Sequence, residues 1–245
     1  MVIESGDRNF TTIVLALSIL ATIILAIIFL QKPELDLIVQ RWFYVDGGGP
    51  NSGFILKQYP IASLLRRMVM IAYALWYIVI ILGLISVFTR KPWPMLRYLK
   101  FDIRQWWFLV ITSLIGPLLI SNLILKDHWG RARPRQLVEF GGELQFSPPL
   151  YLSDQCQTNC SFVSGEASSM FMIFIALAFV IPTKRRLLVF LTLFLGSLSG
   201  LMRIGLGGHF LSDVVFAGLF MCICASLVYW TMFCSRLALE EPNMS

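Results

Sequence analysis

The chain has 245 residues, of which 57% are hydrophobic and 14% are charged, with a formal net charge of +6 and a mean hydropathy of +0.75. A water-soluble domain of this length could not bury so much apolar surface, so the composition excludes an ordinary soluble protein. We find no internal repeat and no sign of a second domain. The expected fold is one all-α integral membrane bundle that occupies residues 1–245.

Apolar runs predict how many helices cross the membrane, because a crossing helix needs about 17–25 residues. Six runs are candidates, the fifth of them short: residues 10–30, 68–88, 106–125, 164–181, 187–202 and 209–234. The first run is too long for the core of a typical signal peptide and has no obvious cleavage site. We therefore expect six transmembrane helices, with the first one retained.

The first loop after this helix has a helical pattern of its own. Its apolar residues recur at helical spacing, with polar residues between them: Leu35, Ile38, Val39, Trp42 and Phe43. This pattern predicts a short amphipathic helix that lies on the bilayer surface. A half-buried loop helix is an equally good interpretation.

Charge does not orient the bundle, because the lysines and arginines divide ten against ten between the two sides. Two cysteines in the long loop after the third run, Cys156 and Cys160, give a weaker indication. We favour a disulfide over two free thiols, and a disulfide requires an oxidising compartment. A metal site would need more ligands than this loop offers. The sequence therefore predicts that this loop faces the periplasm.

Ionisable groups at membrane depth are costly, so their positions are informative. They occur at the ends of the apolar runs, in this order: Lys126, Arg133, Ser164 with Gly165 and Glu166, Arg203, and His209 with Asp213. Because successive spans alternate in direction, all of these groups are expected at one face of the membrane.

That set of residues suits a phosphate group. Lys126, Arg133 and Arg203 supply three cations, and an arginine fork matches phosphate oxygens in pairs. Ser164 and Gly165 open a helix, where free N–H groups and the helix dipole favour an anion. His209 and Asp213 are four residues apart, which predicts one helical face. The carboxylate would then hold one ring nitrogen and leave the other as a nucleophile.

Taken one at a time, these residues also have simpler interpretations. Lys126 could be an anchor at a helix end, and Arg131 and Arg133 could be loop charges that touch lipid headgroups. His209 could be an interfacial histidine, and Glu166 could stabilise a helix N-terminus.

The spacing of the set resembles the type-2 phosphatidic acid phosphatase superfamily, whose signature is K-x6-RP, then PSGH, then SR-x5-H-x3-D. The corresponding stretches here are Lys126-x6-Arg133-Pro134, Val163-Ser164-Gly165-Glu166 and Met202-Arg203-x5-His209-x3-Asp213. The resemblance implies that His209 is a nucleophile forming a phosphohistidine and that Asp213 orients it. It also implies that Lys126, Arg133, Ser164, Gly165 and Arg203 bind the phosphate, without a metal or other cofactor.

Three positions depart from the signature. Glu166 stands where the family has a second histidine, which protonates the leaving group, so we expect Glu166 to be the general acid. Met202 and Val163 replace a serine and a proline, with smaller expected consequences.

The stretch from Lys126 to Pro134, together with the loop cysteines, looks most like bacterial lipid A phosphatases of this superfamily. The resemblance implies a multi-pass protein of the bacterial inner membrane, with its active site facing the periplasm. The expected partners are a lipid phosphate and membrane lipids, with no nucleic acid and no obligate protein. We favour the 4′-phosphate of lipid A over the 1-phosphate. The alternatives are a polyprenyl pyrophosphate or phosphatidylglycerophosphate phosphatase, or a non-catalytic membrane protein that binds lipid phosphates.

Overall fold

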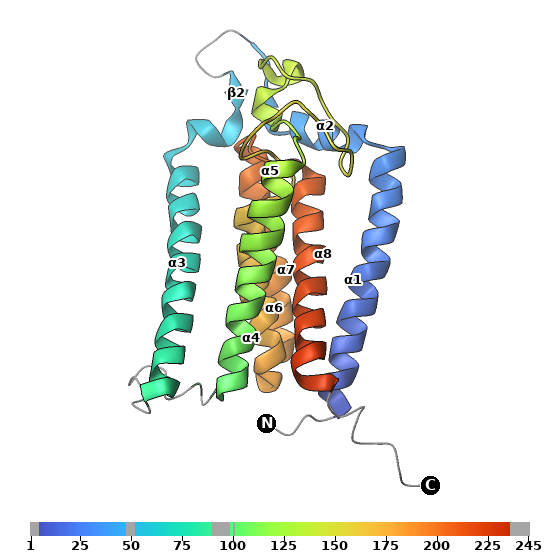
Figure 1. The fold of residues 1–245 in the computed structure, drawn as a ribbon. Coiled ribbons are helices and arrows are strands. Elements are labelled where there is room, and N and C mark those ends of the chain that lie inside the picture. Colours follow the sequence, from blue (N-terminus) through green and yellow to red (C-terminus); the bar gives the residue numbers. More distant parts are fainter. Residues whose placement is uncertain (1–4, 48–51, 90–98, 100, 236–245) are drawn as a thin grey trace.

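A computed structural model describes residues 5–47, 52–89, 99 and 101–235. Five helices in this part of the chain are long and apolar enough to cross a membrane: Ser5–Gln31, Pro60–Thr89, Ile103–His128, Pro182–Gly205 and Leu211–Cys234. They run side by side along one axis (Figure 1). The predicted class, a mostly helical membrane protein, is confirmed.

These five segments carry most of the labelled elements: α1 (Ser5–Gln31), α3 (Pro60–Thr89), α4 (Ile103–Ser113), α5 (Lys126–His128), α7 (Arg185–Gly205) and α8 (Leu211–Tyr229). A π-helical stretch, Leu114–Leu125, joins α4 to α5, and a second one, Trp230–Cys234, extends α8. A short 3-10 turn, Pro182–Lys184, precedes α7.

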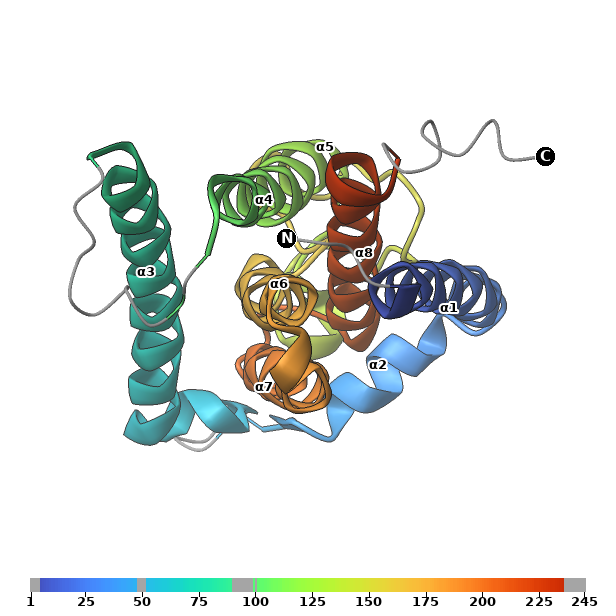
Figure 2. The same cartoon turned by 90° about the horizontal axis from the view of Figure 1, so that it is seen from below.

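Helix α6 (Gly165–Val180) is the centre of the bundle. Its 16 residues span about 24 Å, less than the roughly 30 Å of a hydrocarbon core. It packs against α4, α7 and α8, which surround it when the bundle is seen from below (Figure 2). Twelve of its residues are buried, so this helix contacts protein on nearly every side.

Glycines on α7 allow this close packing. A Cβ at Gly196 would lie 2.3 Å from Phe171 of α6, and one at Gly200 would lie 2.1 Å from Val214 of α8. Both distances are too short for any side chain, so α7 can approach its neighbours only with glycine at these positions.

Apolar side chains cover the outside of the bundle. Leu17 on α1, Leu64 on α3 and Leu193 on α7 are each more than half exposed. Exposed leucines on three different helices are typical of a surface that faces lipid.

A cap of short elements covers one end of the bundle (Figure 1). It contains α2 (Glu34–Arg41), strands β1 (Tyr44–Val45) and β2 (Gly53–Phe54), and the 3-10 turns Ile55–Gln58, Pro134–Gln136 and Val138–Phe140. The strands are antiparallel, with Tyr44 opposite Phe54. A small core under the cap holds the loop between α5 and α6 in place; it consists of Phe54, Ala132, Leu137, Phe140 and Phe210.

Helix α2 lies where the sequence predicts a helix, and its two fully buried residues are polar. Asp36 and Gln40 are completely buried, whereas Ile38 and Trp42 are exposed. Gln40 Nε2 donates a hydrogen bond of 2.7 Å to the carbonyl of Ile204, at the end of α7. These two polar residues attach α2 to the bundle, together with the partly buried Leu35 and Val39.

Candidate active site

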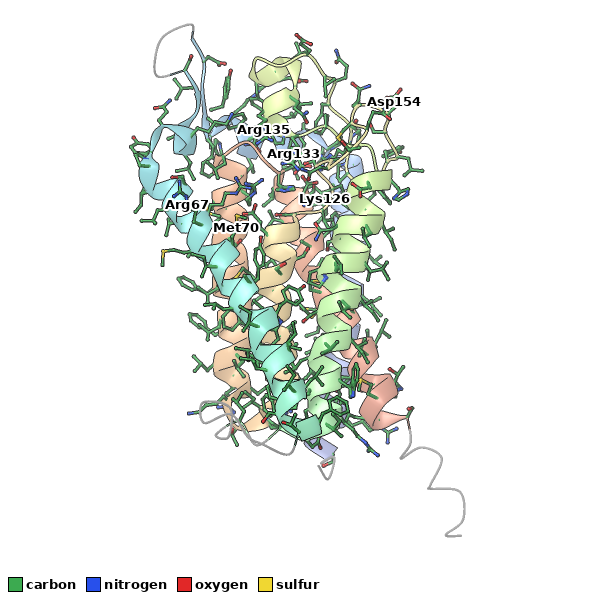
Figure 3. All side chains as sticks on the ribbon, turned by 60° about the vertical axis from the view of Figure 1, so that its left-hand side comes forward. Arg67, Met70, Lys126, Arg133, Arg135 and Asp154 are labelled. Carbon is green, nitrogen blue, oxygen red and sulfur yellow. A yellow bond between two sulfur atoms is a disulfide. The ribbon has the colours of Figure 1, made fainter. Side chains whose placement is uncertain are left out.

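The predicted site residues converge at the capped end of the bundle. Lys126 is the first residue of α5, Gly165 begins α6, and Arg203 lies in the last turn of α7. Lys126 and Arg133 lie together below the cap in Figure 3, near Arg135. Because successive helices alternate in direction, these residues lie at one end of the bundle, as the sequence predicts.

His209 is not part of a helix, so the expectation of one helical face shared with Asp213 is wrong. Helix α8 begins at Leu211, and His209 lies in the turn that precedes it. Gly207 makes this turn possible with a left-handed φ of +64°. The Asp213 carboxylate reaches back to the turn, where Oδ2 accepts a hydrogen bond of 2.8 Å from the backbone N–H of Phe210.

The ring of His209 is buried and has a direct partner that sequence reasoning missed. Nδ1 lies 2.7 Å from the backbone carbonyl of Ser161 and 3.7 Å from Oδ2 of Asp213. A carbonyl can only accept, so Nδ1 carries the proton and Nε2 carries the lone pair. The hydroxyl of Ser161 also donates to Asp213 Oδ2. Ser161 thus connects the histidine to the aspartate.

The pKa of His209 is lowered to about 3, mainly by burial, and further by the positive charges of Arg203 and Lys126. The carboxylate of Asp213 opposes this shift. At neutral pH the imidazole is therefore uncharged, which is the form that a nucleophile needs.

A buried ion network holds Asp213 from the other side. Arg131 donates from Nη1 to Asp213 Oδ1 at 2.7 Å and from Nη2 to Asp36 Oδ2 at 2.8 Å. All three side chains are fully buried. Arg131 also stacks on Phe210, with its guanidinium carbon 4.1 Å from the ring centroid. Arg131 is therefore not a charge directed at lipid headgroups, and Asp36 connects α2 to the site.

The N-terminus of α6 forms a polar pocket with two of the expected cations. A Cβ at Gly165 would lie 2.9 Å from Lys126 Nζ, so glycine is needed for the amine to approach the backbone. Among the described residues, Ser164 Oγ, Arg203 Nε and Glu166 Oε2 are buried without a hydrogen-bond partner. Buried polar groups are normally paired, and two of these three are donors suited to phosphate oxygens.

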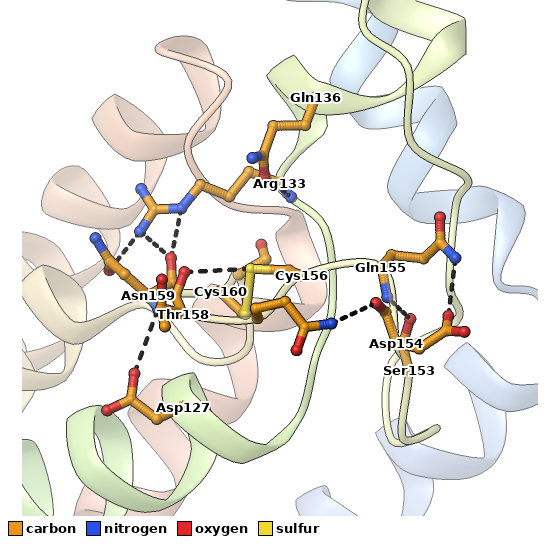
Figure 4. Close-up of a disulfide and its surroundings, with 12 residues drawn as sticks. Asp127, Arg133, Gln136, Ser153, Asp154, Gln155, Cys156, Thr158, Asn159 and Cys160 are labelled. Carbon is orange, nitrogen blue, oxygen red and sulfur yellow. Dashed lines mark hydrogen bonds between the residues drawn. A yellow bond between two sulfur atoms is a disulfide. The ribbon is translucent and has the colours of Figure 1, made fainter.

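Arg133 reaches the site from the loop between α5 and α6. Its guanidinium donates to the backbone carbonyl and to the side-chain oxygen of Asn159 (Figure 4). Burial, and then the charges of Arg135 and Arg203, lower the pKa of Arg133 to about 10. The guanidinium therefore remains positively charged at neutral pH.

The cysteines expected to pair lie in the same loop. Cys156 and Cys160 form a disulfide, with their Cα atoms 5.6 Å apart. Asn159 lies within the short ring that this disulfide closes (Figure 4).

Glu166 is held by two arginines. Its Oε1 is 3.1 Å from Nε of Arg66 on α3 and 3.5 Å from Nη1 of Arg203. Glu166 therefore connects α6 to α3 and to the last turn of α7. Arg66, which is 100 residues from Glu166, was not among the predicted site residues, and the sequence carries no pattern that would have identified it.

A groove of about 370 Å³ leads away from Glu166, between α3 and the helix that carries Lys126. Its lining combines the charged groups Arg66, Lys126 and Glu166 with apolar side chains, among them Met70 and Leu118. A molecule with a charged headgroup and an apolar tail matches this distribution.

The fold and the site define an integral membrane phosphatase. A family model described as the PAP2 superfamily matches residues 105–236, and the chain belongs to this superfamily. The resemblance drawn from the three motifs is thus confirmed, as is the expected class of enzyme, a phosphoric monoester hydrolase.

Three relatives are lipid A 4′-phosphatases. The protein of Francisella tularensis subsp. novicida is 35% identical over 212 residues, which cover 84% of this chain and 90% of the relative. The Rhizobium leguminosarum protein is 44% identical over 132 residues, covering 54% of this chain and 53% of the relative. The Rhizobium etli protein is 45% identical over 130 residues, covering 53% and 48%. No solved structure matches the chain at comparable significance.

Proposed function

We propose that this protein removes the 4′-phosphate from lipid A through a phosphohistidine intermediate. The observation that carries this proposal is the similarity to lipid A 4′-phosphatases, one of which aligns over 84% of this chain. The groove beside Glu166 supports a lipid substrate, since its lining combines the charged Lys126 with apolar side chains such as Met70 and Leu118.

In the proposed reaction, Nε2 of His209 attacks phosphorus and the bond to the sugar oxygen breaks. Lys126, Arg133 and Arg203 neutralise the phosphate oxygens, together with Ser164 Oγ and the N-terminus of α6 at Gly165. Asp213 stabilises the charge that develops on the imidazole. Water then attacks the phosphohistidine and gives a proton to the Glu166 carboxylate; the bond from Nε2 to phosphorus breaks, which releases inorganic phosphate and restores His209 and Glu166.

The departing sugar oxygen needs a proton, and we assign this proton to Glu166. In the free enzyme, Oε1 of Glu166 pairs with Arg66 and Arg203. A bound phosphate would compete for the guanidinium of Arg203 and so leave the Glu166 carboxyl group free to face the departing sugar oxygen.

We further propose a single domain over residues 1–245 with six membrane spans. These are the five long apolar helices and, as the fourth span in chain order, the shorter helix α6. Helix α2 would lie at the bilayer surface, with Ile38 and Trp42 as its outward anchors. The disulfide supports an oxidising side for the cap. The active site would accordingly face the periplasm from the bacterial inner membrane, where it would modify lipopolysaccharide.

The function is tested by incubating the purified protein with lipid A phosphorylated at both the 1 and 4′ positions. We expect release of one phosphate per lipid and a product that keeps the 1-phosphate, identified by mass spectrometry. Release from polyprenyl pyrophosphate or phosphatidylglycerophosphate alone would reassign the substrate. Release from none of these lipids would favour a non-catalytic protein, an outcome that Glu166 in place of a histidine keeps open.

We expect phosphate release to be unaffected by chelators. Three cations already offset the charge of the phosphate, and the chain has only two histidines, His128 and His209. The measurement compares initial rates with and without excess EDTA. A loss of rate that a divalent cation restores would contradict this prediction.

A further inference from the structure

We propose that Asn159 is a positioning residue for Arg133, and that the Cys156–Cys160 disulfide holds Asn159 in position. This inference rests on the proposed function, in which Arg133 binds the phosphate.

The contacts between the two residues are short and numerous. Arg133 Nε donates to the Asn159 carbonyl at 3.0 Å, and Nη2 donates to the same carbonyl and to Oδ1, each at 2.6 Å. Within the described part of the chain, Asn159 is the only hydrogen-bond partner of this guanidinium. Asn159 thus holds one edge of the guanidinium and leaves Nη1 available for a phosphate oxygen.

Arg133 depends on such a partner more than the other two cations do. Lys126 and Arg203 project from helices, whose backbones are already ordered. Arg133 precedes a short 3-10 turn in the long loop after α5. A long flexible side chain on a loop loses much conformational freedom when it binds a ligand. A partner that orders the side chain beforehand reduces this cost.

Asn159 is itself held in an unusual conformation. Its φ is +50°, in the left-handed region that asparagine adopts more readily than most residues. Its N–H lies 3.3 Å from Asp127 Oδ1, and the N–H of Cys160 donates to the Lys126 carbonyl at 3.0 Å. The disulfide closes the loop over four residues. Together these contacts attach the loop to the end of α5 and direct the Asn159 carbonyl at Arg133.

The test is a double-mutant cycle in the affinity of the purified full-length protein for inorganic phosphate, measured by thermal stabilisation in detergent. Asn159→Gly removes the side-chain acceptor and tolerates the positive φ, whereas Asn159→Ala also disfavours that φ. We expect phosphate binding to weaken several-fold in the first variant and about tenfold in the second, as for residues in direct contact. Thr158→Ala, in the same loop, is the matched control and should bind phosphate normally.

In an Arg133→Gln background, neither change at Asn159 should weaken phosphate binding further. Cys156→Ser/Cys160→Ser should behave in both backgrounds as Asn159→Ala does. Equal losses with Arg133 present and with Arg133→Gln would mean that the loop acts only on the fold. Unchanged affinity of the Asn159 variants that keep Arg133 would mean that Asn159 does not position the arginine. Either result overturns the inference. Because the cycle measures binding, it remains readable even if the protein hydrolyses none of the lipids, which would reject the proposed function alone.

Discussion

His209→Ala should abolish phosphate release from lipid A while leaving the protein folded, because the variant has no nucleophile. The Ser161 carbonyl would lose its partner, which costs about 1–3 kcal/mol for a buried group. His209→Asn can still donate to that carbonyl, so it should be inactive with a smaller loss of stability. The measurement is the turnover rate, together with the melting temperature of each variant. His128→Ala, which removes the other histidine, should keep full activity.

Trapping with labelled substrate tests the same step directly. After rapid acid-free quenching, the label should be found on His209 alone. A label on a serine or on a carboxylate would reject the proposed nucleophile.

The low pKa of His209 adds a pH dependence to this first prediction. Since burial lowers the pKa to about 3, the ring should remain neutral from pH 8 down to pH 5. An unfolded histidine binds a proton near pH 6.5. Between pH 6.5 and about 3 the unfolded state therefore holds one more proton than the folded state, and this residue makes the protein less stable as the pH falls.

NMR of the labelled imidazoles can follow this titration, and the signal that disappears in His209→Asn assigns the residue. That signal should not titrate between pH 5 and pH 8. A midpoint near the ordinary imidazole value of about 6.5 would contradict the expected neutral nucleophile.

Glu166→Gln should reduce kcat on lipid A by roughly 10²–10⁴, the usual contribution of a positioned acid. The glutamine keeps the size of the side chain but cannot give a proton to the departing sugar oxygen. The loss should be much smaller with a nitrophenyl phosphate, if the enzyme accepts it, because that leaving group needs no proton. The measurement is the ratio of the two kcat values for each protein.

Glu143→Gln changes an exposed carboxylate in the loop between α5 and α6 and should leave both kcat values unchanged. If Glu166→Gln kept its full kcat on lipid A, Glu166 would serve only to pair with Arg66 and Arg203. An equal loss of kcat on both substrates would indicate that the substitution damages the phosphate pocket and that Glu166 is not the general acid.

The membrane class and the general position of the site follow from the sequence by itself. Both depend on local features that repeat along the chain. Long apolar runs have one low-energy outcome in lipid, because a helix satisfies its own backbone hydrogen bonds. Once the runs are helices, their alternating direction brings Lys126, Gly165 and Arg203 to the same end, whatever the details of packing.

Tertiary structure alone decided which groups touch the reactive residues. Ser161 lies 48 residues from His209, Arg131 lies 95 from Asp36, and Arg66 lies 100 from Glu166. These pairs have no spacing that a helix or strand period would reveal. The first two form when the cap and the loop between α5 and α6 fold over the bundle, and the third forms where α3 packs against α6. The position of His209 was decided in the same way. His209 and Asp213 are four residues apart, a spacing that also fits one helical face. The left-handed turn at Gly207 places the histidine before the helix, where the Ser161 carbonyl accepts a hydrogen bond from its Nδ1.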